Sequence, residues 1–306
     1  NRRGYSTFVM CRDCGHVNEC PHCDIALTYH KYSNKLKCHY CSYEENVPVL
    51  CPECSSDLIR YFGTGTQRVE ESLLEILPEA RILRMYVDTT RRKGAHEKIL
   101  TKFAKGEADI LLGTQMIAKG LDFENVTLVG VLTADSMLHL PDFRSSEKTF
   151  QLLTQVSGRA GRHELTGEVI VQTYTPDHYS IQLASKYDYD TFYQEEMSVR
   201  KKFQYPPYYF LALVTVSHQN KVRVVQTTQK IAQLLMKKVN PNTIILGPTP
   251  SPVSRIKDRY RYQCMIKYRN EPNLRMYLNK IQDLFQEEIR KEDLQIAIDM
   301  QPYHLM

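Results

Sequence analysis

Residues 108–135 read ADILLGTQMIAKGLDFENVTLVGVLTAD, which is two apolar runs joined by a polar loop that contains two glycines. Each run is short, rich in leucine, isoleucine or valine, and bounded by polar residues, as is typical of a strand buried on both faces. Ligands of parallel sheets bind outside the carboxyl ends of the strands, and the loop GTQMIAKGLDF directly follows the first run. This stretch therefore predicts two strands of a parallel sheet with a binding loop between them.

The segments on either side of this stretch alternate in the same way. Strand-like runs occupy 80–88 and 167–174, and amphipathic, helix-like runs occupy 63–77, 95–106 and 147–158. Strands that alternate with helices imply a mostly parallel sheet that helices cover on both faces. The pattern therefore predicts an α/β fold for this part of the chain.

A cysteine-rich block precedes the α/β region. Eight of the nine cysteines lie between 11 and 54, in four C-x-x-C pairs that read CRDC, CPHC, CHYC and CPEC. Each pair places two thiolates on one tight turn, and four such pairs provide two tetrahedral sites of four thiolates, the geometry that zinc prefers. Four thiolates leave no position for water, so the pattern predicts two structural zinc ions. Disulfides would need an oxidising compartment, and the sequence carries no targeting signal for one.

The spacing of the pairs favours one way of sharing the two ions. Only five residues separate Cys14 from Cys20, whereas fourteen separate Cys23 from Cys38, close to the spacing of common zinc ribbons. This favours a nested arrangement, although a cross-braced one stays open. The nested arrangement assigns one ion to Cys20, Cys23, Cys38 and Cys41 and the other to Cys11, Cys14, Cys51 and Cys54. Four histidines could in principle replace a thiolate, namely His16, His22, His30 and His39.

The pattern changes after Pro206-Pro207, where a second domain is expected. Its runs follow the order β-α-β-β-α-β, which is typical of a split, ferredoxin-like α+β sandwich. Within it, RYRY at 259–262 places Arg259 and Arg261 on one face of a strand and two tyrosines on the other. The arginines form either a site for DNA or an acidic peptide, or the solvated face of an ordinary strand.

The net charge of the chain is +5 and its sequence pI is near 8.6, which permits a nucleic-acid partner without requiring one. Four segments are rich in cations, and three of them interleave aromatic residues. This combination suits single-stranded nucleic acid, because phosphates need charge and bases need stacking platforms. No run of about 20 apolar residues and no charged-then-apolar leader occurs, so we expect no membrane contact and a cytoplasmic location.

Residues 155–162 read QVSGRAGR, in which two Gly-Arg steps end a predicted helix in a manner suited to gripping a phosphate. A nucleotide-driven machine also needs a phosphate loop, G-x-x-x-x-G-K-[ST], whose backbone N–H groups and lysine hold the phosphates. None of the chain's glycines is followed by lysine, and no Asp-Glu dipeptide is present to hold magnesium. The chain therefore contains a segment suited to sensing a phosphate but lacks the loop that would bind the nucleotide.

Two of these segments resemble motifs of superfamily 2 helicases, since 110–129 resembles motif V and 155–162 resembles motif VI. With the four cysteine pairs upstream, they make the whole chain similar to the carboxy-terminal part of the bacterial primosomal replication-restart helicases. We therefore expect the chain to be part of a longer protein. The domains implied by the resemblance are a RecA-like second helicase lobe at 1–10 and 55–185, a zinc-binding insert at 11–54, and a C-terminal α+β domain at 186–306.

The resemblance also implies roles for individual residues. Arg159 and Arg162 would reach the γ-phosphate of ATP, and Gln155 would help to place the nucleotide. The motif V positions that would line the nucleotide are Gly120 and Asp122, and those that would contact the DNA backbone are Thr114 and Gln115. ATP and Mg²⁺ would need the phosphate loop of another lobe. The simpler interpretation is that Gly158 and Gly161 shape a turn and that the arginines are solvated.

The function implied by the resemblance is that of an ATP-dependent 3′ to 5′ DNA helicase, which restarts stalled replication forks and assembles the primosome. Its implied partners are forked and single-stranded DNA, single-stranded DNA-binding protein and helicase-loading proteins. A zinc-dependent DNA-binding or assembly module without motor activity is the alternative. The chain alone lacks the phosphate loop and is expected to hydrolyse no ATP.

Overall fold

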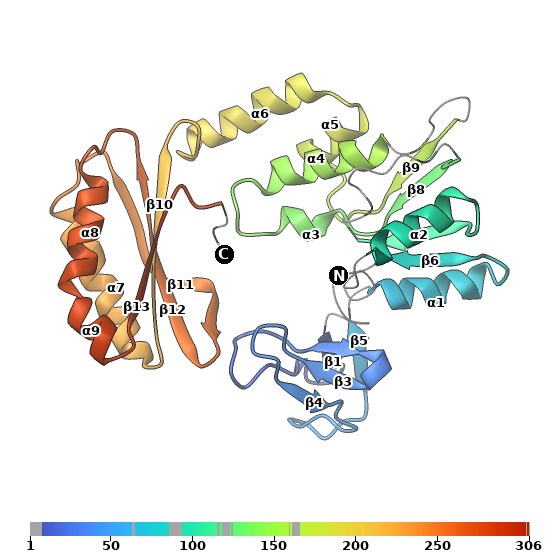
Figure 1. The fold of residues 1–306 in the computed structure, drawn as a ribbon, viewed down its shortest axis with the longest axis horizontal. Helices are drawn as coiled ribbons and strands as arrows, with labels where there is room; N and C mark the ends of the chain where they lie inside the picture. Colours follow the sequence, from blue (N-terminus) through green and yellow to red (C-terminus); the bar gives the residue numbers. More distant parts are fainter. Residues whose placement is uncertain are drawn as a thin grey trace. The chain divides into compact units, whose positions relative to one another are not determined.

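The computed structural model describes residues 8–62, 65–85, 94–114, 117, 123, 125–158, 160, 166–303 and 305. The chain divides into two compact units, of which the first comprises 1–132 with 154–172 and the second 133–153 with 173–306. The region expected to form the helicase lobe therefore contributes to both units. Figure 1 gives the helices and strands in chain order. None of the described helices is both long and apolar enough to cross a membrane.

The cysteine-rich part of the first unit is built on two paired strands. Strand β1, Phe8–Cys11, runs antiparallel to β5, Ile59–Phe62, so the chain enters and leaves this part side by side. Between them lies a three-stranded antiparallel sheet with the order β2-β3-β4, whose bounds are Thr28–His30, Lys35–Lys37 and Glu44–Asn46. A 3-10 turn, η1 at Lys31–Ser33, joins β2 to β3. Leu27 and Leu36 are fully buried and form the small core of this part.

The α/β part of the first unit contains two pairs of parallel strands. Strand β6 runs parallel to β7, and β8 runs parallel to β9. Within the described residues, no strand of one pair is hydrogen-bonded to a strand of the other. The predicted parallel sheet is therefore seen there as two separate two-stranded pieces. The bounds are β6 Ile82–Met85, β7 Ile110–Gly113, β8 Leu128–Val131, β9 Glu168–Val171, α1 Thr66–Ile76 and α2 Ala95–Ala104.

Strands β6 and β7 approach each other closely where β7 ends. A Cβ atom on Gly113 would lie 2.9 Å from the carbonyl oxygen of Met85 and 2.8 Å from the Ile117 side chain, closer than real Cβ contacts allow. Met85 is itself fully buried, so its backbone has little room to move away. Packing therefore requires glycine at the position where the chain enters the predicted binding loop.

Helix α4, Ser145–Ser157, passes from the second unit into the first, because the division falls between Leu153 and Thr154. Its buried face includes Phe150, which stacks on Phe192 with ring centroids 4.0 Å apart. This stack joins α4 to α6 within the second unit. The neighbouring helices of that unit are α3 at Asp135–Leu138, α5 at Tyr179–Ser185 and α6 at Tyr189–Lys202.

The C-terminal part of the second unit is an antiparallel sheet of order β11-β12-β10-β13, with its helices on one face (Figure 1). Alternate residues of β10 point to those helices, since Ala212, Val214 and Val216 are fully buried in one core with Ile231 and Leu278. The bounds are β10 Phe210–His218, α7 Lys221–Met236, β11 Ile244–Ile256, β12 Arg259–Tyr268, α8 Leu274–Leu284, α9 Gln286–Lys291 and β13 Gln295–Met300.

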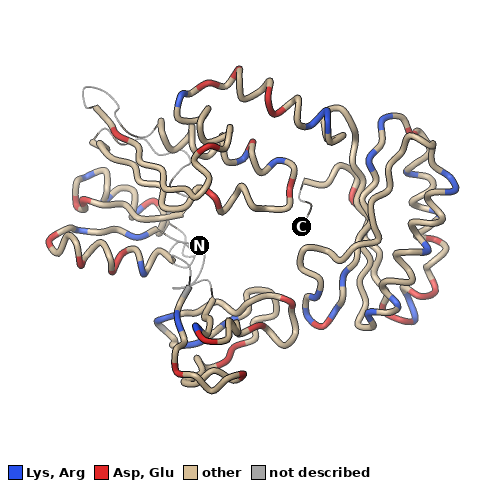
Figure 2. The backbone as a smooth tube through the Cα atoms, turned by 180° about the vertical axis from the view of Figure 1, so that it is seen from behind, with Lys and Arg blue, Asp and Glu red and all other residues tan. Residues whose placement is uncertain are grey.

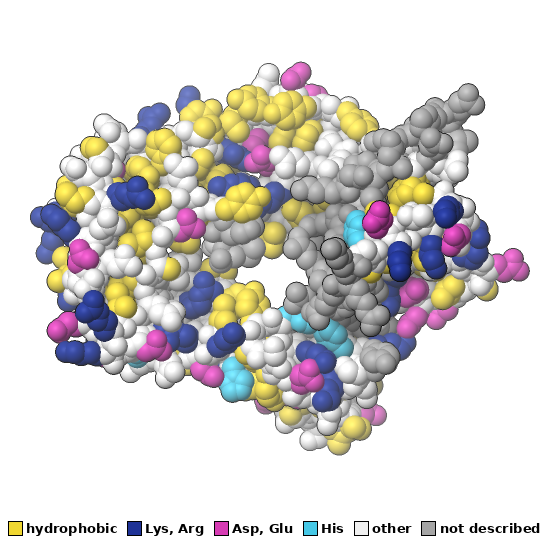
Figure 3. All heavy atoms as spheres, in the orientation of Figure 1, with side chains coloured by type: hydrophobic (Ala, Val, Ile, Leu, Met, Phe, Trp, Pro, Cys, Tyr) yellow, Lys and Arg dark blue, Asp and Glu magenta, His cyan; other side chains and the backbone are white. Residues whose placement is uncertain are grey.

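The exposed face of α6 carries aromatic and basic side chains. Hydrophobic side chains gather over α5 and α6 in Figure 3, and Tyr189 and Tyr193 are 60% and 51% exposed. Lys201 and Lys202 occupy the last turn of the helix, where Figure 2 shows a basic cluster. Cations at this end complement the negative pole of the helix dipole.

Candidate functional site

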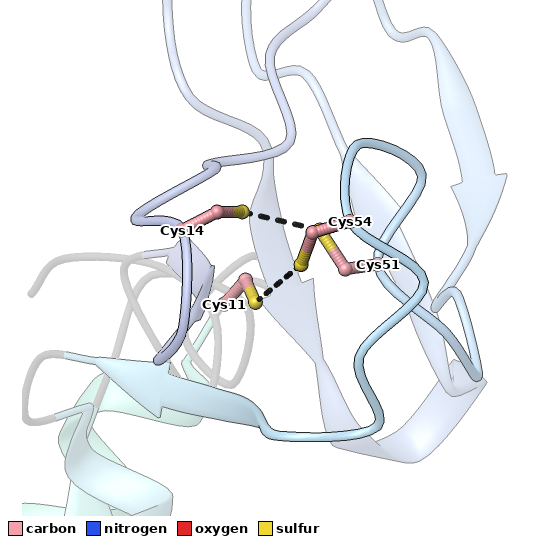
Figure 4. Close-up of side chains that lie close together, drawn as sticks. All are labelled: Cys11, Cys14, Cys51 and Cys54. Atoms are coloured by element: carbon pink, nitrogen blue, oxygen red, sulfur yellow. Dashed lines mark hydrogen bonds between the residues drawn. The ribbon is translucent and has the colours of Figure 1, made fainter.

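The first cysteine group gathers around the paired strands β1 and β5. It consists of Cys11, Cys14, Cys51 and Cys54. The Sγ atoms of Cys11 and Cys54 lie 3.6 Å apart, and those of Cys14 and Cys51 lie 3.5 Å apart (Figure 4). Two tight turns present these sulfurs, in which the N–H of Gly15 donates to the Cys11 carbonyl and the N–H of Ser55 donates to the Cys51 carbonyl. Gly15 and Ser55 have φ values of 76° and 59°, so each turn closes through a left-handed residue.

The second cysteine group lies at the three-stranded sheet. It consists of Cys20, Cys23, Cys38 and Cys41. The Sγ atoms of Cys20 and Cys41 lie 3.4 Å apart, and the backbone N–H of Tyr40 donates to the Sγ atom of Cys38. Ser42 closes this turn in the left-handed region, with a φ of 68°. The two groups are those of the nested arrangement rather than the cross-braced one.

The sulfur geometry of both groups fits a zinc ion. All four Sγ atoms of each group lie within 4.8 Å of one another. A tetrahedral zinc ion with Zn–S bonds of about 2.3 Å separates its sulfurs by about 3.8 Å, whereas a disulfide joins sulfurs about 2.05 Å apart. All nine cysteines belong to the described part of the chain, and none of them forms a disulfide. The two groups therefore support two zinc ions, each bound by four thiolates.

The pKa values of the thiols diverge within these groups. The backbone N–H of Cys14 is the main cause that lowers the pKa of Cys11, to about 7. Burial, together with the neighbouring thiols of Cys41 and Cys38, raises the pKa of Cys20 to about 12. Sulfurs packed this closely do not all ionise at neutral pH without a compensating cation. A bound divalent cation would supply that compensation and keep all four sulfurs as thiolates.

Histidine does not contribute to either group in the described residues. Histidine side chains instead lie at the surface of the cysteine-rich part (Figure 3). The Nε2 atoms of His30 and His39 lie 3.2 Å apart, and Nδ1 of His16 lies 3.9 Å from the Glu53 carboxylate. His16 and Glu53 therefore lie close to the first cysteine group in the sequence, but neither belongs to its four candidate ligands.

The helicase-motif residues are only partly within the described chain. Thr114 directly follows β7, and its carbonyl accepts a hydrogen bond from the N–H of Ile117 at 3.0 Å. Gln155 lies half-buried in the last turns of α4. The remaining predicted residues lie outside the described residues, namely Gln115, Gly120, Asp122, Arg159 and Arg162.

Strand β12 separates its tyrosines from its arginines. Tyr260 and Tyr262 pack against the helix-covered core, so Arg259 and Arg261 lie on the opposite face of the sheet. The side chain of Arg259 is only 17% exposed, and its guanidinium pairs with the Asp293 carboxylate and donates to the Ser217 carbonyl at 3.1 Å. Arg261 has no ion pair with any described residue. The two arginines are therefore not equivalent, because Arg259 already has an intramolecular partner.

Two buried charged groups of the second unit could not be predicted from the sequence. Asp135 begins α3, and Arg200 of α6 lies between Glu147 and Glu196. The only local signal is the spacing of Glu196 and Arg200, which are four residues apart on one helix. Glu147 is 53 residues from Arg200, and nothing in the sequence indicates that they meet.

Three family models match the chain. The model for the "PriA DNA helicase Cys-rich region (CRR) domain" matches residues 20–45. The model for the "Helicase conserved C-terminal domain" matches 47–164, and that for the "Primosomal protein N C-terminal domain" matches 201–303.

The chain is also similar to curated proteins named replication restart protein PriA. It is 65% identical to the Bacillus subtilis protein over 306 residues, which is 100% of this chain and 38% of that protein. It is 47% identical to the Synechocystis protein, over 99% of this chain and 36% of that protein. It is 35% identical to the Haemophilus influenzae protein, over 100% of this chain and 42% of that protein. The chain thus spans less than half of the length of these relatives.

Proposed function

The chain belongs to the PriA family of replication restart proteins, and on this premise we propose that it forms the ATP-sensing part of an ATP-dependent 3′ to 5′ DNA helicase. The whole enzyme would act on stalled replication forks and assemble the primosome there. The observation that carries the proposal is a combination of two features in one α/β region. This region contains the two four-cysteine groups, and its helix α4 includes the first residues of QVSGRAGR at 155–162. Either feature alone would fit many proteins.

We infer three domains, which are the helicase lobe at 1–10 and 55–185, the zinc insert at 11–54 and the C-terminal domain at 186–306. The antiparallel pairing of β1 with β5 supports an insertion, because the chain enters and leaves the insert side by side. Helix α7 connects β10 to β11 along the chain. In the C-terminal sheet, β12 lies between these two strands. This order supports a ferredoxin-like split βαβ sandwich.

The two zinc ions would be structural. Four thiolates complete the shell of each ion, so neither ion would bind or activate a water molecule. The core of the insert is small, and binding of the ions would stabilise the turns that carry the cysteines. The insert would then keep its shape while it contacts fork DNA or another primosome protein.

The phosphate chemistry would depend on two lobes. Arg159 and Arg162 would donate hydrogen bonds to the γ-phosphate as its charge redistributes, and Gln155 would help to place the nucleotide. Gly120 and Asp122 would line the nucleotide side of the motif V loop. ATP and Mg²⁺ would be held by a phosphate loop that this chain does not contain. The arginines therefore lower the barrier only for a nucleotide that the other lobe has fixed.

DNA would bind at two places in this chain. Thr114 and Gln115 would contact the DNA backbone on the flank of the motif V loop opposite the nucleotide side. On the C-terminal sheet, Arg261 is the better candidate for a phosphate or an acidic peptide, because Arg259 is paired with Asp293. The anionic partners would be forked DNA, single-stranded DNA and the acidic tail of single-stranded DNA-binding protein. Helicase-loading proteins would join the complex at the fork.

The decisive experiment compares the 306-residue chain with a protein that joins it to a lobe carrying a phosphate loop. The joined protein should hydrolyse ATP in a DNA-stimulated manner and unwind forks, whereas the chain alone should bind DNA without turnover. A joined protein that binds forks but never hydrolyses ATP would support the alternative, a zinc-dependent DNA-binding or assembly module.

A further inference from the structure

The two cysteine groups differ in how far solvent reaches their cysteines. In the first group, Cys14 and Cys54 are exposed, whereas Cys11 and Cys51 are each only 2% exposed. In the second group, three cysteines are buried and the fourth is half-buried. The buried three are Cys20, Cys23 and Cys38, and the half-buried one is Cys41. The first group therefore offers two exposed cysteines to a small molecule in solution, whereas the second group offers none.

The two turns of the first group are built alike. In each turn, the N–H of the first cysteine donates to the carbonyl five residues later, and its own carbonyl accepts from the N–H four residues later. In both turns the first cysteine is buried and the second is exposed. The left-handed residues Gly15 and Ser55 directly follow the exposed cysteines. The two C-x-x-C pairs therefore present one shielded and one accessible sulfur each.

The close sulfur contacts cross from one turn to the other. The Sγ atom of the exposed Cys14 lies 3.5 Å from that of the buried Cys51 (Figure 4). In the same way, the Sγ atom of the exposed Cys54 lies 3.6 Å from that of the buried Cys11. A disulfide joins sulfurs about 2.05 Å apart, so an approach of about 1.5 Å would connect either pair. Each exposed sulfur thus has a buried sulfur of the opposite turn as a neighbour with which it could form a disulfide.

These contacts have a chemical consequence when the sulfurs bind zinc. A cysteine that coordinates zinc is deprotonated, and the thiolate is the form of cysteine that oxidants attack. Susceptibility to oxidation follows thiolate character and exposure. All eight sulfurs would share the thiolate character, so exposure distinguishes them. Cys14 and Cys54 are therefore the sulfurs that a small peroxide would reach first.

We propose that the first cysteine group is a redox-sensitive zinc site, in which hydrogen peroxide joins an exposed cysteine to its buried neighbour on the opposite turn and the ion is released. The second group would keep its ion under the same conditions, because its cysteines are shielded. The proposal rests on zinc binding by the first group and is independent of ATP hydrolysis.

The oxidation proceeds in two balanced steps. The thiolate of Cys14 attacks one oxygen of hydrogen peroxide, so that an S–O bond forms, the O–O bond breaks and hydroxide leaves. The thiolate of Cys51 then attacks the resulting sulfenic sulfur, so that an S–S bond forms, the S–O bond breaks and a second hydroxide leaves. Two protons from solvent convert the hydroxides to water. Two thiolates are thereby oxidised to one disulfide, and one peroxide is reduced to two waters. The same steps apply to Cys54 and Cys11.

The disulfide would change the insert without detaching it. Cys11 ends β1, and the turn at 51–54 precedes β5, so the new bond would link the two segments by which the chain enters and leaves the insert. Only two ligands of the first group would remain, and they would hold the ion more weakly than four. Thiols reduce disulfides, so a reductant together with zinc would restore the original site.

The test treats the full-length protein that contains this chain, loaded with two zinc ions per chain, with hydrogen peroxide. A chromogenic chelator follows the zinc released. One ion per chain should leave at least about tenfold faster than the other, since the two groups differ in exposure. Mass spectrometry after alkylation of the free thiols should find a disulfide between Cys14 and Cys51 or between Cys11 and Cys54. Dithiothreitol with added zinc should restore two ions per chain.

Two matched variants assign the fast and slow ions. Cys23→Ser removes a ligand of the second group, and Cys51→Ser removes a ligand of the first, at positions that are 0% and 2% exposed. Each variant should bind one ion firmly. The ion of Cys23→Ser should leave in the fast phase, and that of Cys51→Ser in the slow phase. If a variant does not fold, the disulfide mapped in wild type decides.

Several results would overturn the inference. These are release from the second group first or at an equal rate, a first group that peroxide leaves reduced, and a disulfide confined to one C-x-x-C pair. If wild type binds only one ion before peroxide is added, the assignment of two zinc sites fails and the inference fails with it. The ATP-sensing role proposed above is tested separately by turnover, so either proposal can fail while the other stands.

Discussion

Replacing Asp135 with asparagine perturbs a buried carboxylate that joins two segments of the second unit. Asp135 is 4% exposed and accepts hydrogen bonds from the hydroxyls of Thr173 and Thr175, at 2.9 and 2.8 Å, and from the N–H of Tyr174. These bonds tie the chain that follows β8 to the chain that follows β9. Burial raises the pKa of Asp135, but the hydrogen bonds outweigh burial and lower the pKa to about 2 from 3.8.

The lowered pKa sets the sign and the size of the expected effect. The folded state favours the carboxylate, so its contribution to stability is complete well above pH 3.8 and is lost as the pH falls through about 2. A shift of nearly two pKa units corresponds to about 2 kcal/mol at neutral pH. With an unfolding entropy of about 2.1 cal/mol/K per residue over the roughly 155 residues of the second unit, this lowers its melting temperature by about 6 °C.

The assay is thermal unfolding of wild type and Asp135→Asn across the pH range, with hydrogen exchange of β10 peptides to follow the second unit alone. The difference should be largest at pH 7 and about half as large at pH 3, where the unfolded carboxyl is mostly protonated and the folded one is not. Asp190→Asn, at an exposed position of α6, is the control and should change the melting temperature much less. An unchanged melting temperature at pH 7, or a difference that grows as the pH falls, would refute the reasoning.

Further predictions concern the metal centres, the C-terminal sheet and the isolated chain. Elemental analysis should find two zinc ions per chain, and a single ion in the wild-type protein would contradict the assignment of two zinc sites. Cys23→Ser should leave one ion and destabilise the insert while the second unit stays folded. Arg261→Ala should weaken binding of forked DNA or an acidic peptide and flatten its salt dependence, whereas Arg259→Ala should mainly lower the melting temperature; equal binding losses would count against this distinction. The 306-residue chain should show no DNA-stimulated ATP turnover, and activity that co-purifies with it and depends on Arg159 and Arg162 would overturn the two-lobe account.

The cysteine groups were accessible to sequence reasoning because their determinants are local. Each C-x-x-C turn is closed by its own backbone, and the short link between Cys14 and Cys20 makes a nested grouping easier than a sequential one. The alternation of RYRY likewise depends only on the period of a strand, and it places Tyr260 and Tyr262 on the core side. Local rules suffice where a feature is confined to one turn or one strand.

The partners of the charged residues were not accessible in this way. Arg259 meets Asp293 only because the turn after α9 reaches the first residue of β12, and Arg200 meets Glu147 only because α6 packs along α4. Both pairs depend on how elements far apart in the sequence come together, which charge patterns do not encode. The sequence therefore indicates which arginines are present, whereas the fold decides which of them are available to a ligand.

The most direct test of the central claim is the turnover of a protein that joins this chain to its phosphate-loop lobe, with Arg159→Ala or Arg162→Ala. The account predicts that either substitution lowers kcat for DNA-stimulated ATP hydrolysis by about 10³-fold, as loss of an arginine finger does, while the affinity for forked DNA stays close to wild type. Turnover that survives both substitutions, or a loss of DNA binding in parallel with turnover, would contradict an ATP-sensing role for this segment.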